Sequence, residues 1–204
     1  MQILKGRWSW LTRKGPLSAG QRFHFLTGWF SWFADALHLV FTMMALYWTA
    51  LMLGLPKYFN LPLQLFLVPI MGFFVSKAVF GIALYRVRVP CSWKDTIMAS
   101  IASMALSHAI ARGIFMGLAK KKGEFVRTAK SRRIGKRPSA FSSVREELLM
   151  FVALMLAIAG MAVFYGFQYI EGELWMIVLA AQAIPYVSAL IGAWIAHRSG
   201  ENAG

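Results

Sequence analysis

Five apolar segments dominate the pattern of hydrophobic and polar positions along the chain. They cover residues 27–54, 61–85, 95–118, 146–168 and 173–196, and polar or charged residues separate them. Each segment is long enough to cross a hydrocarbon layer of ~30 Å as a helix that rises about 1.5 Å per residue. The pattern therefore predicts an all-α membrane protein with several spans.

Composition and charge agree with this interpretation. Of 204 residues, 58% are hydrophobic, and the mean hydropathy is +0.56. The net charge of +14 could indicate a nucleic-acid-binding protein, but basic residues between apolar spans more simply anchor loops beside anionic lipid headgroups. We therefore expect membrane lipids, and no nucleic acid, as partners. A lone cysteine, Cys91, offers neither an internal disulfide nor a metal cluster.

Basic residues orient the spans. The residues up to Arg22 contain no acid, so the positive-inside rule places them in the cytoplasm. The first span then leads out to the short loop "PKYFN", and the second returns to Arg86, Arg88 and Lys94. The strongest signal lies further on, where residues 120–137 hold nine cations and a single acid, Glu124. We expect this loop to be cytoplasmic as well.

A cytoplasmic loop at 120–137 requires that residues 95–118 do not cross the membrane. Their polar residues gather loosely on one side of a helix, as in a segment that lies along the membrane face. These residues are Ser100, Ser103, Ser107, His108 and Arg112. We therefore predict four transmembrane helices, amphipathic interfacial helices and a basic cytoplasmic loop. The alternative is a fifth span, built from small residues that pack against neighbouring helices.

The expected order along the chain follows from this topology. It comprises a cytoplasmic or interfacial segment (1–26), a transmembrane pair (27–85), an interfacial helix (93–118), the basic loop (119–143), a second transmembrane pair (144–197) and a cytoplasmic tail (198–204). Both termini are then cytoplasmic.

Three ionisable residues lie inside the predicted spans and are candidates for intramembrane or channel roles. Asp35 and His38 share a helix face, and Lys77 lies one to two turns from the end of its span. Charge in hydrocarbon usually faces a cavity or a partner. Asp35 could also lie at headgroup level, and Lys77 could extend to the headgroups. Neither the Asp35 and His38 pair nor Lys77 has beside it the paired carboxylates, or the nucleophile and base, that catalysis requires.

Short motifs add a resemblance to a known family. "MQILKGRW", followed by "PLSAGQRFHFL" and a long apolar run, resembles the stretch after the Q-x-x-R-W motif of processive family-2 glycosyltransferases, such as the bacterial cellulose synthase catalytic subunit. The predicted order of spans, interfacial helix and loop is similar too. That family's gating loop carries F-x-V-T-x-K, which Phe125, Thr128 and Lys130 match, whereas Arg127 stands at the valine position.

The resemblance implies the membrane half of a longer polysaccharide synthase in the bacterial inner membrane. Gln2, Arg7 and Trp8 have the spacing Q-x-x-x-x-R-W, so the acceptor motif itself would lie upstream of Met1. Catalytic residues, and the divalent metal (Mg or Mn), would belong to the missing catalytic domain. The partners implied are a nucleotide sugar, UDP-linked in that family, and a growing glycan. The loop at 124–130 would close over the donor site, with Lys130 meeting the diphosphate.

Aromatic residues are the expected lining of a glycan path, because sugar rings stack on them. The candidates are Tyr47, Trp48, Trp175, Tyr186 and Trp194. Several alternatives stay open. Phe125 could dip into the bilayer surface while Lys130 meets lipid phosphate. The whole chain could also be a small multi-pass transporter or channel, or a non-catalytic membrane partner that anchors another protein through its basic loop.

Overall fold

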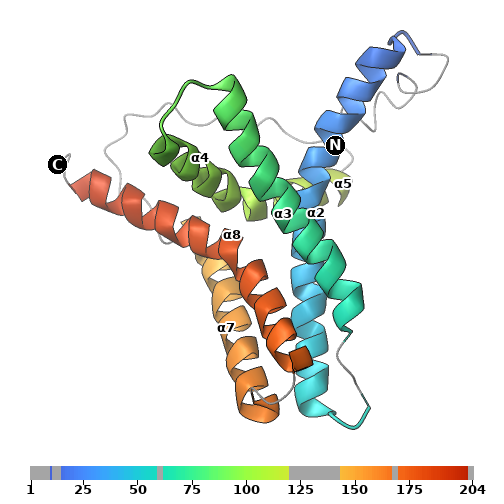
Figure 1. The fold of residues 1–204 in the computed structure, drawn as a ribbon, viewed down its shortest axis with the longest axis vertical. Helices are drawn as coiled ribbons and strands as arrows, with labels where there is room; N and C mark the ends of the chain where they lie inside the picture. The colour runs from blue at the N-terminus through green and yellow to red at the C-terminus, as the bar shows by residue number, and fades with distance from the viewer. Residues whose placement is uncertain (1–9, 11–14, 59–61, 120–142, 167–169, 202–204) are drawn as a thin grey trace.

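The computed structural model describes residues 10, 15–58, 62–119, 143–166 and 170–201. Within these ranges the chain forms helices and no strand (Figure 1). In chain order the main helices are α2 (Ala19–Gly54), α3 (Leu63–Arg88), α4 (Trp93–Ala105), α5 (Ser107–Ala119), α7 (Arg145–Tyr165) and α8 (Ile170–Glu201). The all-α prediction is thus confirmed for this part of the chain.

Helix α2 is longer than the first predicted span, because its start is set by a cap rather than by hydrophobicity. Ser18 accepts a hydrogen bond from the Gln21 backbone, and the Gln21 side chain accepts one from the Ser18 backbone. This capping box satisfies amides that a helix start leaves without partners. One helix therefore runs continuously from the polar segment into the span, and it ends before Pro56, whose ring disfavours a helical conformation at Leu55.

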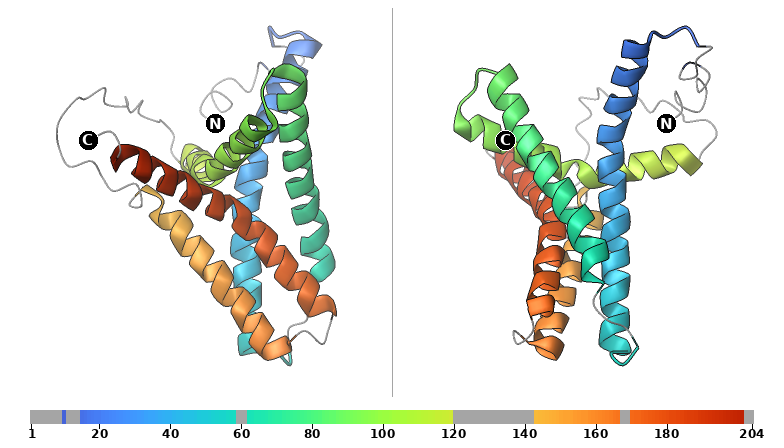
Figure 2. Two further views of the ribbon diagram at one scale, coloured as in Figure 1. Left: turned by 60° about the vertical axis from the view of Figure 1, so that its left-hand side comes forward. Right: turned by 45° about the vertical axis from the view of Figure 1, so that its right-hand side comes forward.

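Two helical hairpins form the body of the molecule. Helix α2 ends and α3 begins at the same end of the molecule at which α7 ends and α8 begins (Figures 1 and 2). Helices α4 and α5 run across the other part of the bundle, where α4 packs on α8 and α5 packs on α2. Helix α8 contacts both α7 and α3, which joins the two hairpins.

The segment expected to be one interfacial helix is two helices. Leu106 separates α4 from α5, and its N–H bonds the Ser103 carbonyl at 3.3 Å, as in the tighter turn of a 3₁₀ helix. Each helix has 13 residues, so each extends for about 20 Å, less than the ~30 Å hydrocarbon layer. Figure 2 shows the two meeting at an angle.

Four helical segments of the described chain are long and apolar enough to cross a membrane. They are Ala19–Gly54, Trp93–Ala119, Arg145–Tyr165 and Ile170–Arg198. Three correspond to predicted spans, and the other is the segment predicted to be interfacial. Helix α3, the second predicted span, is not among them, and several of its side chains lie outside those described. The interfacial placement of 93–118 therefore stays a prediction.

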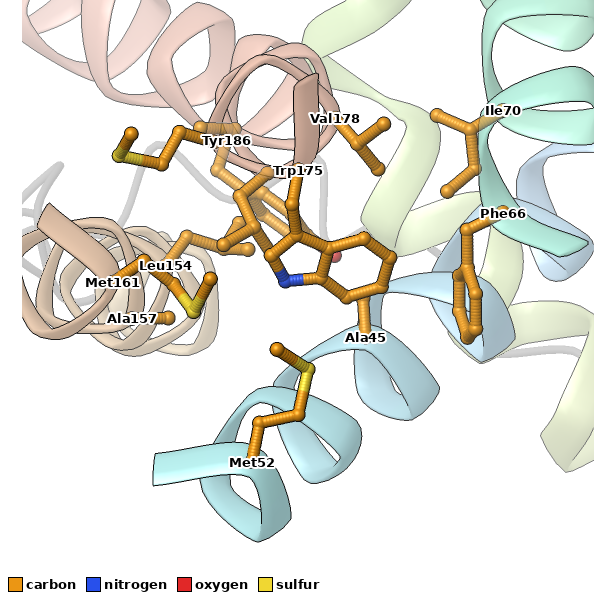
Figure 3. Packing of buried hydrophobic residues seen from close by; sticks show 13 residues of the cluster. Ala45, Met52, Phe66, Ile70, Leu154, Ala157, Met161, Trp175, Val178 and Tyr186 are labelled. Carbon is orange, nitrogen blue, oxygen red and sulfur yellow. The ribbon is translucent and has the colours of Figure 1, made fainter. Parts of the chain in front are cut away.

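The apolar core lies between the two hairpins and is centred on Trp175 (Figure 3). The Trp175 side chain is fully buried. Its ring meets the edge of Phe66 at a centroid distance of 5.2 Å, and its Nε1–H donates to Thr49 Oγ1 at 2.9 Å. The same core includes Ala45 and Met52 from α2, Ile70 from α3, and Leu154, Ala157 and Met161 from α7. We call this cluster the Trp175 core.

Outside the core, long apolar side chains are exposed along the helices. Val163 is 81% exposed, Val68 71% and Leu156 68%. Monomeric soluble proteins rarely expose apolar surface on this scale, whereas membrane helices present it to lipid. Helix α8 also bends along its length (Figure 2), and it contains Pro185, a residue that removes one helical hydrogen bond and kinks a helix.

Candidate functional site

Ionisable side chains from α5 and α7 meet where α5 passes the beginning of α7. His108 Nε2 lies 3.1 Å from Glu146 Oε2, and Arg112 donates to Glu146 Oε1 at 2.6 Å. The Arg112 and Glu146 side chains are about half exposed, whereas the His108 side chain is 10% exposed. We call these three residues, together with Glu147, the Glu146 junction.

The junction extends into the bundle through Tyr186 of α8. The Tyr186 ring lies 6.0 Å from the His108 ring and 6.0 Å from the His38 ring, centroid to centroid. Tyr186 is only 1% exposed. Three helices thus place two half-buried imidazoles next to one buried phenol, and the Glu146 carboxylate contacts one of the imidazoles, that of His108.

A cavity of about 390 Å³ opens at the Glu146 junction. Residues from α5 and from the start of α7 line it, namely His108, Ala109, Arg112, Met116, Ser143, Arg145, Glu146 and Glu147. Glu147 is 7% exposed. A second cavity of about 610 Å³ lies between α2 and α5 and is mainly apolar, with His24, Gly28, Trp32, Ile110 and Gly113 among its lining residues. The first cavity therefore combines both signs of charge, and the second suits apolar groups.

Asp35, His38 and Lys77 are the ionisable residues predicted to lie inside the spans. Asp35 is buried, at 6% exposure, and His38 is half-buried beside Tyr186. Tyr186 also belongs to the Trp175 core, so His38 lies at the edge of that core. Lys77 lies in α3, but its side chain is outside those described. The structure thus brings His38 to the candidate site.

The five aromatic residues predicted to line a glycan path differ in burial. Trp175 and Tyr186 are buried, whereas Tyr47 is 66% exposed and Trp194 is 48% exposed. The Trp194 ring lies under the Arg198 guanidinium at 4.3 Å, which is typical of an aromatic residue at a polar boundary. Trp48 is partly buried against the Trp175 core. Only Trp175 and Tyr186 of the five therefore face the interior fully.

A stripe of polar and aromatic side chains marks the inner face of α8. Trp175, Gln182 and Tyr186 are seven and four residues apart, so they share a face of the helix. Gln182 is fully buried, and neither polar atom of its side chain has a hydrogen-bond partner among the described residues. The stripe meets α2 at Thr49 and at His38. A buried amide without a hydrogen-bond partner lowers the stability of the fold, so Gln182 is a candidate for a functional rather than a structural role.

Several of these residues were not identified from the sequence. Glu146, Glu147 and Gln182 escaped notice, although a pair of acids at the start of an apolar segment and a glutamine inside one are visible signals. His108 and Arg112 were interpreted only as the polar side of an interfacial helix. Their joint contact with Glu146, more than 30 residues away in sequence, depends on how α5 packs.

The predicted gating loop cannot be placed in this geometry. Phe125, Arg127, Thr128 and Lys130 lie outside the described residues. Among the residues that the structure describes, no three or more His, Cys, Asp or Glu side chains are grouped to hold a metal ion. Comparison of the chain with protein-family models, with curated proteins and with solved structures finds no match.

Proposed function

We propose that this chain is the membrane region of a polysaccharide synthase. In this proposal a catalytic domain transfers sugar from a nucleotide donor, UDP-linked by the resemblance, to a growing glycan, and the helices export the product. The membrane would be the bacterial inner membrane, with both termini in the cytoplasm. The divalent ion implied by the resemblance belongs to the catalytic domain, so we assign it no residue of this chain.

One observation carries the proposal furthest. The basic segment that contains "EFVRTAK" leaves from the end of α5 and rejoins the chain just before α7. Arg112 and His108 of α5 both bond Glu146 of α7, so the helix that precedes the segment is tied to the start of the helix that follows it. Flanking helices that are tied together provide the fixed frame that the proposed closure over a donor site needs.

The inner stripe of α8 supports the export part of the proposal. Sugar rings stack on aromatic faces, and their hydroxyls need hydrogen-bond partners, so Trp175, Tyr186 and Gln182 offer suitable chemistry. The stripe is packed against α2, with Trp175 fully buried. Export along it therefore requires α2 and α8 to separate while the glycan passes.

The gating role is tested in the gene product that joins this region to a catalytic domain. We expect Phe125→Ala or Thr128→Ala to lower polymer formation from nucleotide sugar by roughly tenfold or more in membrane vesicles, since each ~1.4 kcal/mol lost in the transition state is tenfold in rate. Ser139→Ala, in the same loop but outside the motif, is the matched control and should leave synthesis unchanged.

Two outcomes would contradict the proposal. The first is unchanged synthesis in both motif variants, with expression equal to that of the control. The second is a cysteine at position 131 that reacts with an impermeant thiol reagent applied from outside the cell, because the loop would then lie on the wrong side. The DNA upstream of Met1 gives an independent check, since the proposal expects an in-frame catalytic domain that ends in Q-x-x-R-W.

A further inference from the structure

Two charged residues that line the cavity at the Glu146 junction have no ion-pair partner among the residues that the structure describes. Glu146 bonds Arg112 and His108. Glu147 and Arg145 line the same cavity, and neither makes a side-chain hydrogen bond or ion pair within the described part of the chain. Arg145 is exposed, but Glu147 is only 7% exposed. The Glu147 carboxylate lines the cavity and is therefore placed to accept hydrogen bonds from a cation that enters it.

The start of α7 offers an anion site beside this carboxylate. Its N-cap residue, Val144, provides no side-chain hydrogen bond to the first turn. The amides of that turn favour negative charge, which the acids Glu146 and Glu147 of the same turn supply in part. The Arg145 guanidinium lines the cavity next to them and can bind phosphate oxygens through two N–H groups. One cavity therefore presents a place for an anion and, close by, a place for a cation.

The surface below the cavity is apolar. Leu148, Leu149 and Val152 of α7 are 41%, 60% and 45% exposed, and Met116, which lines the cavity, is 47% exposed. The charged cavity thus lies where the surface of a candidate membrane span changes from ionic to apolar. This is the level at which a phospholipid has its headgroup, with its acyl chains alongside the helix.

We propose that this cavity binds the headgroup of a phospholipid that carries a primary ammonium group. The ammonium donates to the Glu147 carboxylate, and the phosphate bonds Arg145 and the first amides of α7. A quaternary ammonium has no N–H to donate, so the site distinguishes an ethanolamine headgroup from a choline headgroup. Lipid binding here does not depend on polysaccharide synthesis, and the two proposals can fail separately.

The test uses the full chain, purified in detergent and mixed with equal amounts of phosphatidylethanolamine and phosphatidylcholine that have the same acyl chains. Native mass spectrometry counts the bound lipid. We expect about a tenfold preference for the ethanolamine lipid, the size of one charge-assisted hydrogen bond. Equal retention of the two lipids by the unmodified protein would overturn the proposal without any mutation.

Variants locate the site. Glu147→Gln removes the charge with little change of shape and should abolish the preference, whereas Glu173→Gln should retain it. Glu173 is an exposed acid in the first turn of α8, the helix start at the other end of the bundle. A preference that survives Glu147→Gln would place the site elsewhere. Soluble glycerophosphoethanolamine is then added as a competitor. If it displaces the lipid at equal concentration, the ligand is a free headgroup rather than a lipid, and the proposal is wrong.

Discussion

The Trp175 core and the Glu146 junction hold the same bundle together by different means. In the core, a buried indole fills the space between α2, α3 and α7, and its one polar atom bonds Thr49. In the junction, half-exposed charges join α5 to α7. Dense packing has one favourable arrangement, whereas exposed ion pairs contribute little each. We infer that the core sets the stability of the fold and that the junction can rearrange at small cost.

The largest expected effect comes from emptying the core. Trp175→Ala should lower the free energy of unfolding by about 3–5 kcal/mol, because it leaves a cavity and deprives the buried Thr49 hydroxyl of its donor. Trp194→Ala is the matched control and should lose less than about 1 kcal/mol, since that ring is half exposed. Denaturant titration in detergent measures both. Equal losses would mean that Trp175 does not centre the core.

The junction should respond to charge reversal with a local change. Glu146→Arg places a cation beside Arg112 and removes the carboxylate that His108 contacts, so we expect faster amide hydrogen exchange in α5 and a loss of at most about 1 kcal/mol in unfolding free energy. The double variant that adds Arg112→Glu restores opposite charges across the same gap. Exchange in α5 should then return towards its original rate, and failure to do so would argue against this pair as the link.

The smallest expected effect is a difference in stability between alanine substitutions at two glycines. A Cβ at Gly160 would lie 2.7 Å from Leu53 Cδ1, whereas a Cβ at Gly113 would meet nothing within 4 Å. Helix propensity favours alanine over glycine by about 1 kcal/mol. Gly113→Ala should therefore stabilise the protein by up to this amount, and Gly160→Ala should gain less, because Leu53 must turn aside. Thermal unfolding of the two variants ranks them, and the reverse order would show looser packing at Gly160 than at Gly113.

Much of the helix layout could be predicted because hydrophobic runs are long and loops are polar. The segment 146–168 corresponds to α7, and 173–196 lies within α8. The positions of helix ends are predicted less accurately where local hydrogen bonds determine them. The capping box at Ser18 and Gln21 starts α2 at Ala19, within the residues 1–26 that the sequence predicts to be a separate segment. The segment around Leu106 contains no proline and no glycine that would indicate a break, so two helices could not be predicted there.

The candidate site was harder to predict, because it depends on contacts between distant segments. His38 could be selected as a polar group in a span, but its neighbour Tyr186 could not be known without the packing of α2 on α8. Likewise Tyr47 and Trp175 are both aromatic residues in apolar segments, and only the fold separates the exposed ring from the buried one. The topology, the gating loop and the link to sugar transfer stay predictions.

The continuity of α2 has a mechanical consequence. Its 36 residues form a rod of about 54 Å, much longer than the ~30 Å hydrocarbon layer. Helix α5 packs against this rod near Gly28 and Trp32, and the Trp175 indole bonds it at Thr49. One unbroken helix therefore carries both contacts, so a displacement of α2 at its contact with α5 would be transmitted to the bond at Thr49.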